Sequence, residues 1–63
     1  MITKITKCYT RTYRDNGQTT SYVEWINASG NNGRTEGSPQ NTHMKSLIAR
    51  ANREGVKHEM ETW

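Results

Sequence analysis

The stretch RDNGQ, Arg14 to Gln18, separates two runs that are rich in threonine, tyrosine, valine, isoleucine and tryptophan. β-Branched and aromatic side chains fit a pleated surface, so these runs predict strands over residues 1–14 and 19–28. Between them, Asn16-Gly17 supplies residues that tolerate positive φ, which tight hairpin turns require. RDNGQ is therefore predicted to be the tip of a β-hairpin, around which the rest of the fold is built.

A second turn follows at SGNNG, residues 29–33, which contains two glycines and two asparagines. The next residues, 34–37, are polar and predict a weak third strand at an edge of the sheet. With two turns this short, the three strands are expected to form a small antiparallel sheet.

A helix is predicted over residues 39–54. Ser38-Pro39 has the pattern of an N-cap followed by proline at the first helical position, and Asn41 and Thr42 are alternative caps. Gly55 stands where a helix commonly ends. The apolar residues recur at the spacing i, i+3, i+4, i+7 and so form one face of the helix: Met44, Leu47, Ile48 and Ala51.

The last segment, VKHEMETW at residues 56–63, fits two structures. It is either a fourth strand along the sheet or a tail whose Met60 and Trp63 pack on the core. The whole chain, residues 1–63, is thus expected to be one α+β domain of order β-β-β-α, in which a single helix covers one face of a three-stranded sheet.

The register of the hairpin decides which side chains the helix covers, because a slip of one residue exchanges the two faces. A two-residue loop at Asn16-Gly17 pairs Cys8 with Trp25, and Tyr9 and Tyr22 then share the opposite face. A three-residue loop pairs Tyr9 with Val23. We favour this register because it places more apolar side chains together on the face beneath the helix: Ile5, Tyr9, Tyr13, Val23 and Trp25. The side chains that it leaves on the uncovered face are Thr6, Cys8, Thr10, Thr12, Tyr22, Glu24 and Ile26.

Composition limits the core. Only 30% of the 63 residues are hydrophobic, and the mean hydropathy is −1.09, so any core must be thin. Dimerisation, or folding onto a partner, is one way to make up this shortfall. The single cysteine excludes an internal disulfide, and we find neither a signal peptide nor an apolar run long enough to span a membrane. We therefore expect a complete cytoplasmic protein.

No motif in the chain indicates catalysis. Cys8, His43 and His58 are far apart in sequence and match no zinc-binding spacing. Nucleophilic catalysis by Cys8 would require a neighbouring base, and a cysteine in a strand is more often a small buried side chain. GNNGRTEG follows a strand without opening into a helix at the spacing of a phosphate loop. We expect no enzyme, no metal and no cofactor.

Nucleic-acid binding is the remaining chemical signal. The net charge of +3 and the pI near 9.4 lean weakly toward polyanionic partners. Cations recur along the first predicted strand with aromatic residues between them, and such side chains neutralise phosphates and stack on bases. A sheet face can also enter the major groove of DNA. The candidate nucleic-acid-binding residues are Lys7, Arg11, Arg14, Tyr22 and Arg34.

The segments YRDNGQTTSYVEWINASGNNGRTEG and SPQNTHMKSLIARANREG, together residues 13–55, resemble the amino-terminal arm-site DNA-binding domain of phage and transposon tyrosine integrases, and more distantly the plant AP2 fold. The resemblance lies in element order and turn spacing. It implies that the uncovered sheet face enters the major groove, that Arg11, Arg14 and Arg34 contact phosphate or bases, and that Tyr22 is a lesser candidate. The chain departs from that family in lacking a basic amino-terminal tail and in its extra VKHEMETW ending.

A second function fits the same elements. The chain has the size of many phage accessory factors, which often act by occluding a host protein. It could thus be a protein-interaction or inhibitor module, as a monomer or a dimer, that uses the uncovered face or an open strand edge. The structural alternative to both functions is that the aromatic residues build the thin core while the cations keep the hairpin soluble.

Overall fold

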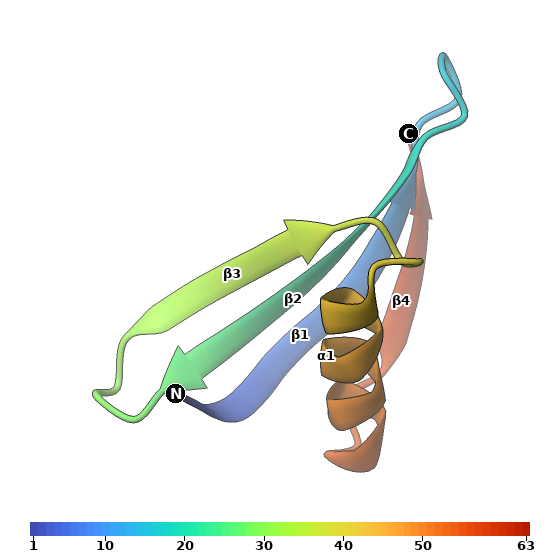
Figure 1. Ribbon diagram of the computed structural model, residues 1–63. Coiled ribbons are helices and arrows are strands. Elements are labelled where there is room, and N and C mark those ends of the chain that lie inside the picture. Colours follow the sequence, from blue (N-terminus) through green and yellow to red (C-terminus); the bar gives the residue numbers. More distant parts are fainter.

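The computed structural model describes all residues, 1–63, and forms a four-stranded mixed sheet with one helix on one face (Figure 1). The strands lie side by side in the order β3-β2-β1-β4, with β1 antiparallel to β2, β2 antiparallel to β3, and β4 parallel to β1. The expected α+β class and β-β-β-α order are confirmed, and VKHEMETW contributes a fourth strand. The elements are β1 (Ile2–Thr12), β2 (Thr19–Asn27), β3 (Asn32–Gly37), α1 (Thr42–Arg53) and β4 (His58–Thr62).

The hairpin closes with a four-residue loop, so both predicted registers are wrong. The Tyr13 amide donates to the Gln18 carbonyl at 2.9 Å, and Cys8 pairs with Val23. Gly17 has a φ of +70°, whereas no non-glycine residue has a positive φ. A two-residue type I′ turn needs two successive positive φ angles. Asn16 instead accepts a hydrogen bond on its side chain from the Gln18 amide at 2.9 Å, as an Asx turn.

This register places the tyrosines on the face that the helix leaves open. The pairing is shifted by two residues from the register of a two-residue loop, so each side chain lies on the same face as in that register. The favoured three-residue register would put each side chain of β1 or β2 on the wrong face relative to the other strand. Tyr9 pairs with Tyr22, and Cys8 pairs with Val23 beneath the helix. The expectation that Cys8 and Thr10 lie on the open face is therefore wrong, and so is the expectation that Tyr9 lies under the helix.

Two irregularities in β1 turn Ile5 into the core. The pairing with β2 shifts between Ile2 and Lys4 and again between Ile5 and Lys7. A β-bulge inserts one residue and so changes the side to which the following side chains point. As a result Ile5 lies on the same face as Cys8, and only 1% of its surface is exposed.

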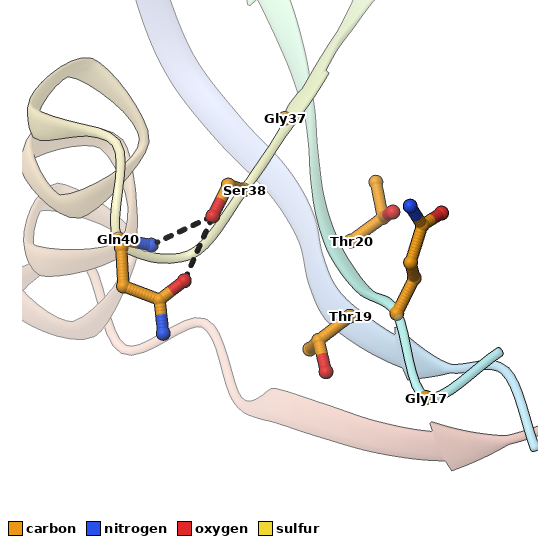
Figure 2. Close-up of a pocket in the computed structure, with 7 residues that line it drawn as sticks. Gly17, Thr19, Thr20, Gly37, Ser38 and Gln40 are labelled. Atoms are coloured by element: carbon orange, nitrogen blue, oxygen red, sulfur yellow. Dashed lines mark hydrogen bonds between the residues drawn. The ribbon is translucent and has the colours of Figure 1, made fainter.

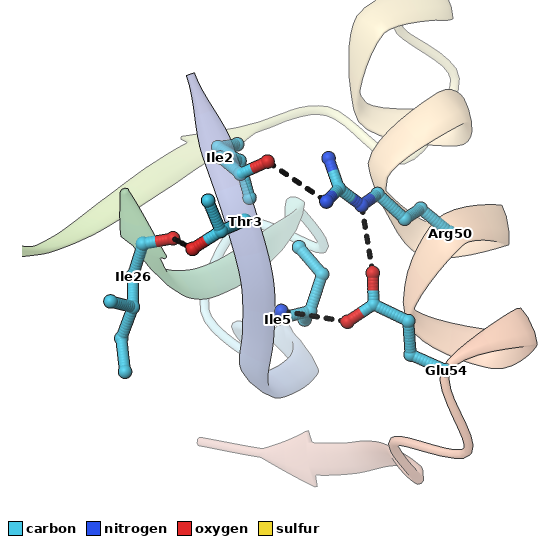
Figure 3. A network of polar contacts seen from close by, with 6 residues as sticks. All are labelled: Ile2, Thr3, Ile5, Ile26, Arg50 and Glu54. Atoms are coloured by element: carbon cyan, nitrogen blue, oxygen red, sulfur yellow. Dashed lines mark hydrogen bonds and ion pairs between the residues drawn. The ribbon is translucent and has the colours of Figure 1, made fainter. Parts of the chain in front are cut away.

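The helix supplies hydrogen-bond partners to this irregular part of β1 (Figure 3). The Ile5 amide donates to Glu54 Oε1 at 2.9 Å, and Arg50 Nη2 donates to the Ile2 carbonyl at 2.9 Å. Arg50 and Glu54 also form an ion pair at 2.7 Å between Nε and Oε2. The first two bonds fix the end of the helix to the strand where the β1–β2 ladder is irregular, and the ion pair joins the two side chains that make them.

The core is small and lies between α1 and the sheet. Two polar side chains, Thr10 and Ser21, are also buried. Their burial is possible because the Thr10 hydroxyl is hydrogen-bonded to Ser21 Oγ at 2.8 Å and to His58 Nε2 at 2.6 Å. The second of these bonds ties β4 to β1. The buried cluster consists of Ile5, Cys8, Val23, Met44, Leu47 and Ala51, with Ile2, Trp25, Ile48 and Val56 packed against it.

The starts of the helix and of the third strand differ from the prediction by two residues or more, and the other predicted bounds by at most two. The helix begins at Thr42, because the Asn41 side chain caps it by accepting from the amides of His43 and Met44 at 2.9 and 3.3 Å. Ser38-Pro39 forms the turn before it. The third strand begins at Asn32 rather than residue 34, because the Trp25 side chain lies against Gly33 and donates from Nε1 to the Thr35 hydroxyl at 3.0 Å.

Candidate binding face

The face of the sheet opposite α1 carries no other element. Residues paired across neighbouring strands point to the same side, so the register defines which side chains share this face. We call it the open face. Its residues are Lys4, Lys7, Tyr9, Arg11 and Tyr13 from β1 and its end, Tyr22, Glu24 and Ile26 from β2, Arg34 and Glu36 from β3, and Glu59, Glu61 and Trp63 from β4 and its end.

A stacked pair of tyrosines lies at the centre of the open face. The rings of Tyr9 and Tyr22 have centroids 4.9 Å apart and are inclined by only 13°. The hydroxyl groups of Tyr13 and Tyr22 are hydrogen-bonded at 3.2 Å. Although no helix covers them, Tyr9 and Tyr22 are only 4% and 6% exposed.

Cationic side chains cover these rings. Lys7 Nζ lies 4.9 Å from the Tyr9 centroid, and the Cζ atoms of Arg11 and Arg34 lie 5.1 and 5.3 Å from the Tyr22 centroid. Both types of contact are within the range of cation–π attraction. The outermost layer of the open face is therefore made of ammonium and guanidinium groups over tyrosine, and a base could stack on Tyr22 only if a guanidinium moved.

Arg11 is the most constrained of the cations. Its Nε donates to Glu61 Oε1 at 3.0 Å, and its Cζ lies 4.2 Å from the Trp63 ring. Glu61 first, and Tyr13 second, raise the pKa of Arg11 above its ordinary value. The hydrogen bond with Tyr22, and then that with Arg11, lower the pKa of Tyr13, while the bond with Tyr13 and burial raise the pKa of Tyr22.

The structure brings together four of the five predicted site residues. Lys7, Arg11, Tyr22 and Arg34 surround the tyrosine stack. Arg14 makes no cation–π contact with the stack, because it is an exposed residue of the hairpin loop, where its amide donates to the Trp63 carbonyl at 2.8 Å.

Among the members of the open face that sequence reasoning missed are Tyr9, Glu61 and Trp63. The favoured register places Tyr9 in the core, whereas the two-residue register, in which Tyr9 shares a face with Tyr22, was a signal that could have placed it. Glu61 and Trp63 reach the face because β4 pairs in parallel with β1. No local pattern indicates that pairing, since the two strands are far apart in the sequence.

Carboxylates alternate with cations across the open face. Glu24 lies between Lys7 and Arg34 on the neighbouring strands, Glu36 lies beside Tyr22, and Glu59 lies beside Tyr9. With Glu61, four carboxylates therefore match the four cations Lys4, Lys7, Arg11 and Arg34. The chain's net charge of +3 comes from residues outside this face.

The remaining surface offers little chemistry. A polar hollow of about 510 Å³ between the hairpin and the β3–α1 turn has no titratable side chain, and within it Ser38 Oγ donates to Gln40 Oε1 at 2.8 Å (Figure 2). Cys8 is buried, and burial raises its pKa, which disfavours the reactive thiolate. No cluster of three or more histidine, cysteine, aspartate or glutamate side chains could hold a metal ion, and the single helix is too short to cross a membrane.

Comparisons with protein-family models, with curated proteins and with solved structures found no match to this chain. The resemblance to the integrase arm-site domain therefore stays a prediction from element order and turn spacing.

Proposed function

We propose that this protein is a non-enzymatic interaction module that binds another protein through its open face. The observation that supports this best is the balance of charges over a buried aromatic pair. Interfaces between proteins are enriched in tyrosine, tryptophan and arginine, and the open face combines the Tyr9–Tyr22 stack with Arg11, Arg34 and the 61% exposed Trp63.

The guanidinium groups suit a surface that is dehydrated on binding. Arginine is more weakly hydrated than lysine, and its planar group stacks on aromatic rings. Arg11 already has Glu61 as a partner, and Arg34 lies over Tyr22. Both groups thus have a fixed orientation before a partner arrives, which lowers the ordering cost of association.

The alternating charges define the partner by chemistry. A matching protein surface presents carboxylates opposite Lys7 and Arg34, and cations opposite Glu36 and Glu59. Such a pattern selects a partner and its orientation more than it adds affinity. A host protein that the module occludes is the partner we propose.

A second candidate function is DNA binding, and the two unpaired cations favour it. The only ion pairs in the protein are Arg11–Glu61 and Arg50–Glu54, so Lys7 and Arg34 are free to contact phosphate. In this case the open face would lie against the duplex, with cations rather than tyrosine rings at the contact. Two phosphate contacts, from Lys7 and Arg34, would give a slope of about −1.8 in a plot of log K against log salt concentration.

One experiment separates the two functions. The tagged protein is used to capture partners from lysate with and without nuclease, and in parallel its binding to a labelled DNA duplex is measured in rising salt. The test variant is Lys7→Glu/Arg34→Glu, and the control is Lys45→Glu, which reverses a charge on the exposed side of α1. Circular dichroism verifies the fold of each variant.

A specific protein that survives nuclease, is retained by Lys45→Glu and is lost with the double variant supports the protein-binding function. Salt-sensitive duplex binding that the double variant abolishes supports DNA binding instead. If neither assay responds to the double variant, both functions of the open face are wrong.

A further inference from the structure

The outer edge of β3 has backbone hydrogen-bonding groups without partners. The Asn27 amide donates to the Asn31 carbonyl at 3.0 Å, in the same register as the β2–β3 pairing. Hydrogen-bonded pairs alternate along an antiparallel ladder, so Gly33 and Thr35 exchange bonds with β2. The amides and carbonyls of Arg34 and Glu36 therefore point away from the sheet, and Figure 1 shows no other element beside this edge.

The side chains on this edge are complementary to themselves. If two copies pair antiparallel about a two-fold axis at Thr35, Arg34 of each copy lies opposite Glu36 of the other. The outward backbone groups of those two residues then form the hydrogen-bonded pairs of the new ladder. Shifting the register by two residues puts Arg34 opposite Arg34 or Glu36 opposite Glu36, which like-charge repulsion disfavours.

We propose that two copies of this chain associate edge to edge through β3, in the register that pairs Arg34 with Glu36. The two-fold axis would stand perpendicular to the sheet. The product is a continuous eight-stranded sheet with both open faces on one side and both helices on the other. This proposal concerns the edge rather than the face, so it does not rest on the identity of the partner that the open face binds.

The other edge of the sheet cannot pair with itself in this way. The Trp63 amide donates to the Thr12 carbonyl, and the Arg14 amide donates to the Trp63 carbonyl. By alternation, Glu59 and Glu61 bond to β1, and His58, Met60 and Thr62 point their backbone groups outward. The antiparallel registers that overlap most of β4 with a second β4, centred on Glu59, Met60 or Glu61, each place a glutamate opposite a glutamate. Repulsion between these glutamates disfavours pairing at this edge, as charged side chains commonly do at the edges of natural sheets.

The test is sedimentation equilibrium of the full chain over a wide range of concentration. The wild type should associate reversibly and weakly, because the paired segment is only six residues long. Glu36→Arg places arginine opposite arginine in both pairs and should yield a monomer. The double variant Arg34→Glu/Glu36→Arg restores opposite charges at both positions and should recover the dimer.

A third variant distinguishes the two edges. Met60→Lys adds a charge on β4, where the side chain is 72% exposed, and should leave association unchanged. The proposal is overturned if the wild type is monomeric throughout, if Glu36→Arg still dimerises, if the double variant fails to recover the dimer, or if Met60→Lys abolishes it. Because the readout is mass, failure here leaves the capture experiment on the open face unaffected.

Discussion

Gly33 shows how one residue sets the length of a strand. A Cβ atom placed there would collide with three atoms of the Trp25 ring, so the tryptophan can pack against β3 only because this position lacks a side chain. With the ring in place, Trp25 Nε1 reaches the Thr35 hydroxyl. The residues of β3 are polar, so the sequence of this segment does not indicate the contact. The apolar side chain that packs on β3 is Trp25, which belongs to the neighbouring strand.

We predict that Gly33→Ala destabilises the protein by about 1–3 kcal/mol, the usual cost of inserting atoms into a packed site. The displaced indole should also shift the tryptophan emission. Urea unfolding followed by fluorescence measures both effects. Asn32→Ala is the matched control, because its position is exposed, and an equal loss for the two variants would show that the Trp25 contact is not responsible.

At the scale of elements, the contact between the end of α1 and β1 depends on the negative charge of Glu54. The Glu54 carboxylate accepts from the Ile5 amide and from Arg50, and these two contacts, in that order, lower the pKa of Glu54 below its ordinary value of 4.5. Since the pKa is lowered in the folded state, the contribution of this group to stability is present above pH 4.5 and is lost as the pH falls through the folded value.

We predict that Glu54→Gln is less stable than the wild type at neutral pH and that the difference shrinks as the pH is lowered below 4.5. Thermal unfolding at a series of pH values measures it. Asp15→Asn serves as the control, because Asp15 is exposed in the hairpin loop and forms no ion pair. A difference between the wild type and Glu54→Gln that stays constant with pH would contradict the proposed role of the charge.

The whole molecule is elongated, with extents of 38 × 20 × 19 Å, and only ten of its residues are buried. A domain of this length is expected to have a free energy of unfolding of about 3–9 kcal/mol. Its one helix contributes three buried residues, Met44, Leu47 and Ala51, which hold it against the sheet.

We predict that Leu47→Ala costs about 2–5 kcal/mol, a large share of the stability expected for a domain of this length, and therefore lowers the melting temperature strongly. Ile48→Ala, at a half-buried position on the next residue of the helix, should cost less. Circular dichroism during heating measures both. Equal melting temperatures for the two variants would show that Leu47 is not a main contact between helix and sheet.

The sequence alone was enough to predict the three antiparallel strands, the helix and their order, because those features follow from short-range patterns. Turn residues at 16–17 and 29–33 mark the hairpins, and the spacing of Met44, Leu47 and Ala51 marks the helix face. It was also enough to select Lys7, Arg11, Tyr22 and Arg34, since all four lie on predicted strands of one small sheet. Whether these residues bind a partner remains a prediction.

Only the tertiary structure decided which face each side chain occupies and what lies beside β1. The hairpin register depends on a loop length that Asn16-Gly17 does not specify, and each one-residue change inverts the faces of the strands. The irregular part of β1 is held by bonds that Arg50 donates and that Glu54, the C-cap of the helix, accepts. The parallel pairing of β4 depends on contacts between residues about fifty positions apart, and this pairing brings Glu61 and Trp63 to Arg11. Such contacts leave no local pattern in the sequence, because only the folded chain brings their members together.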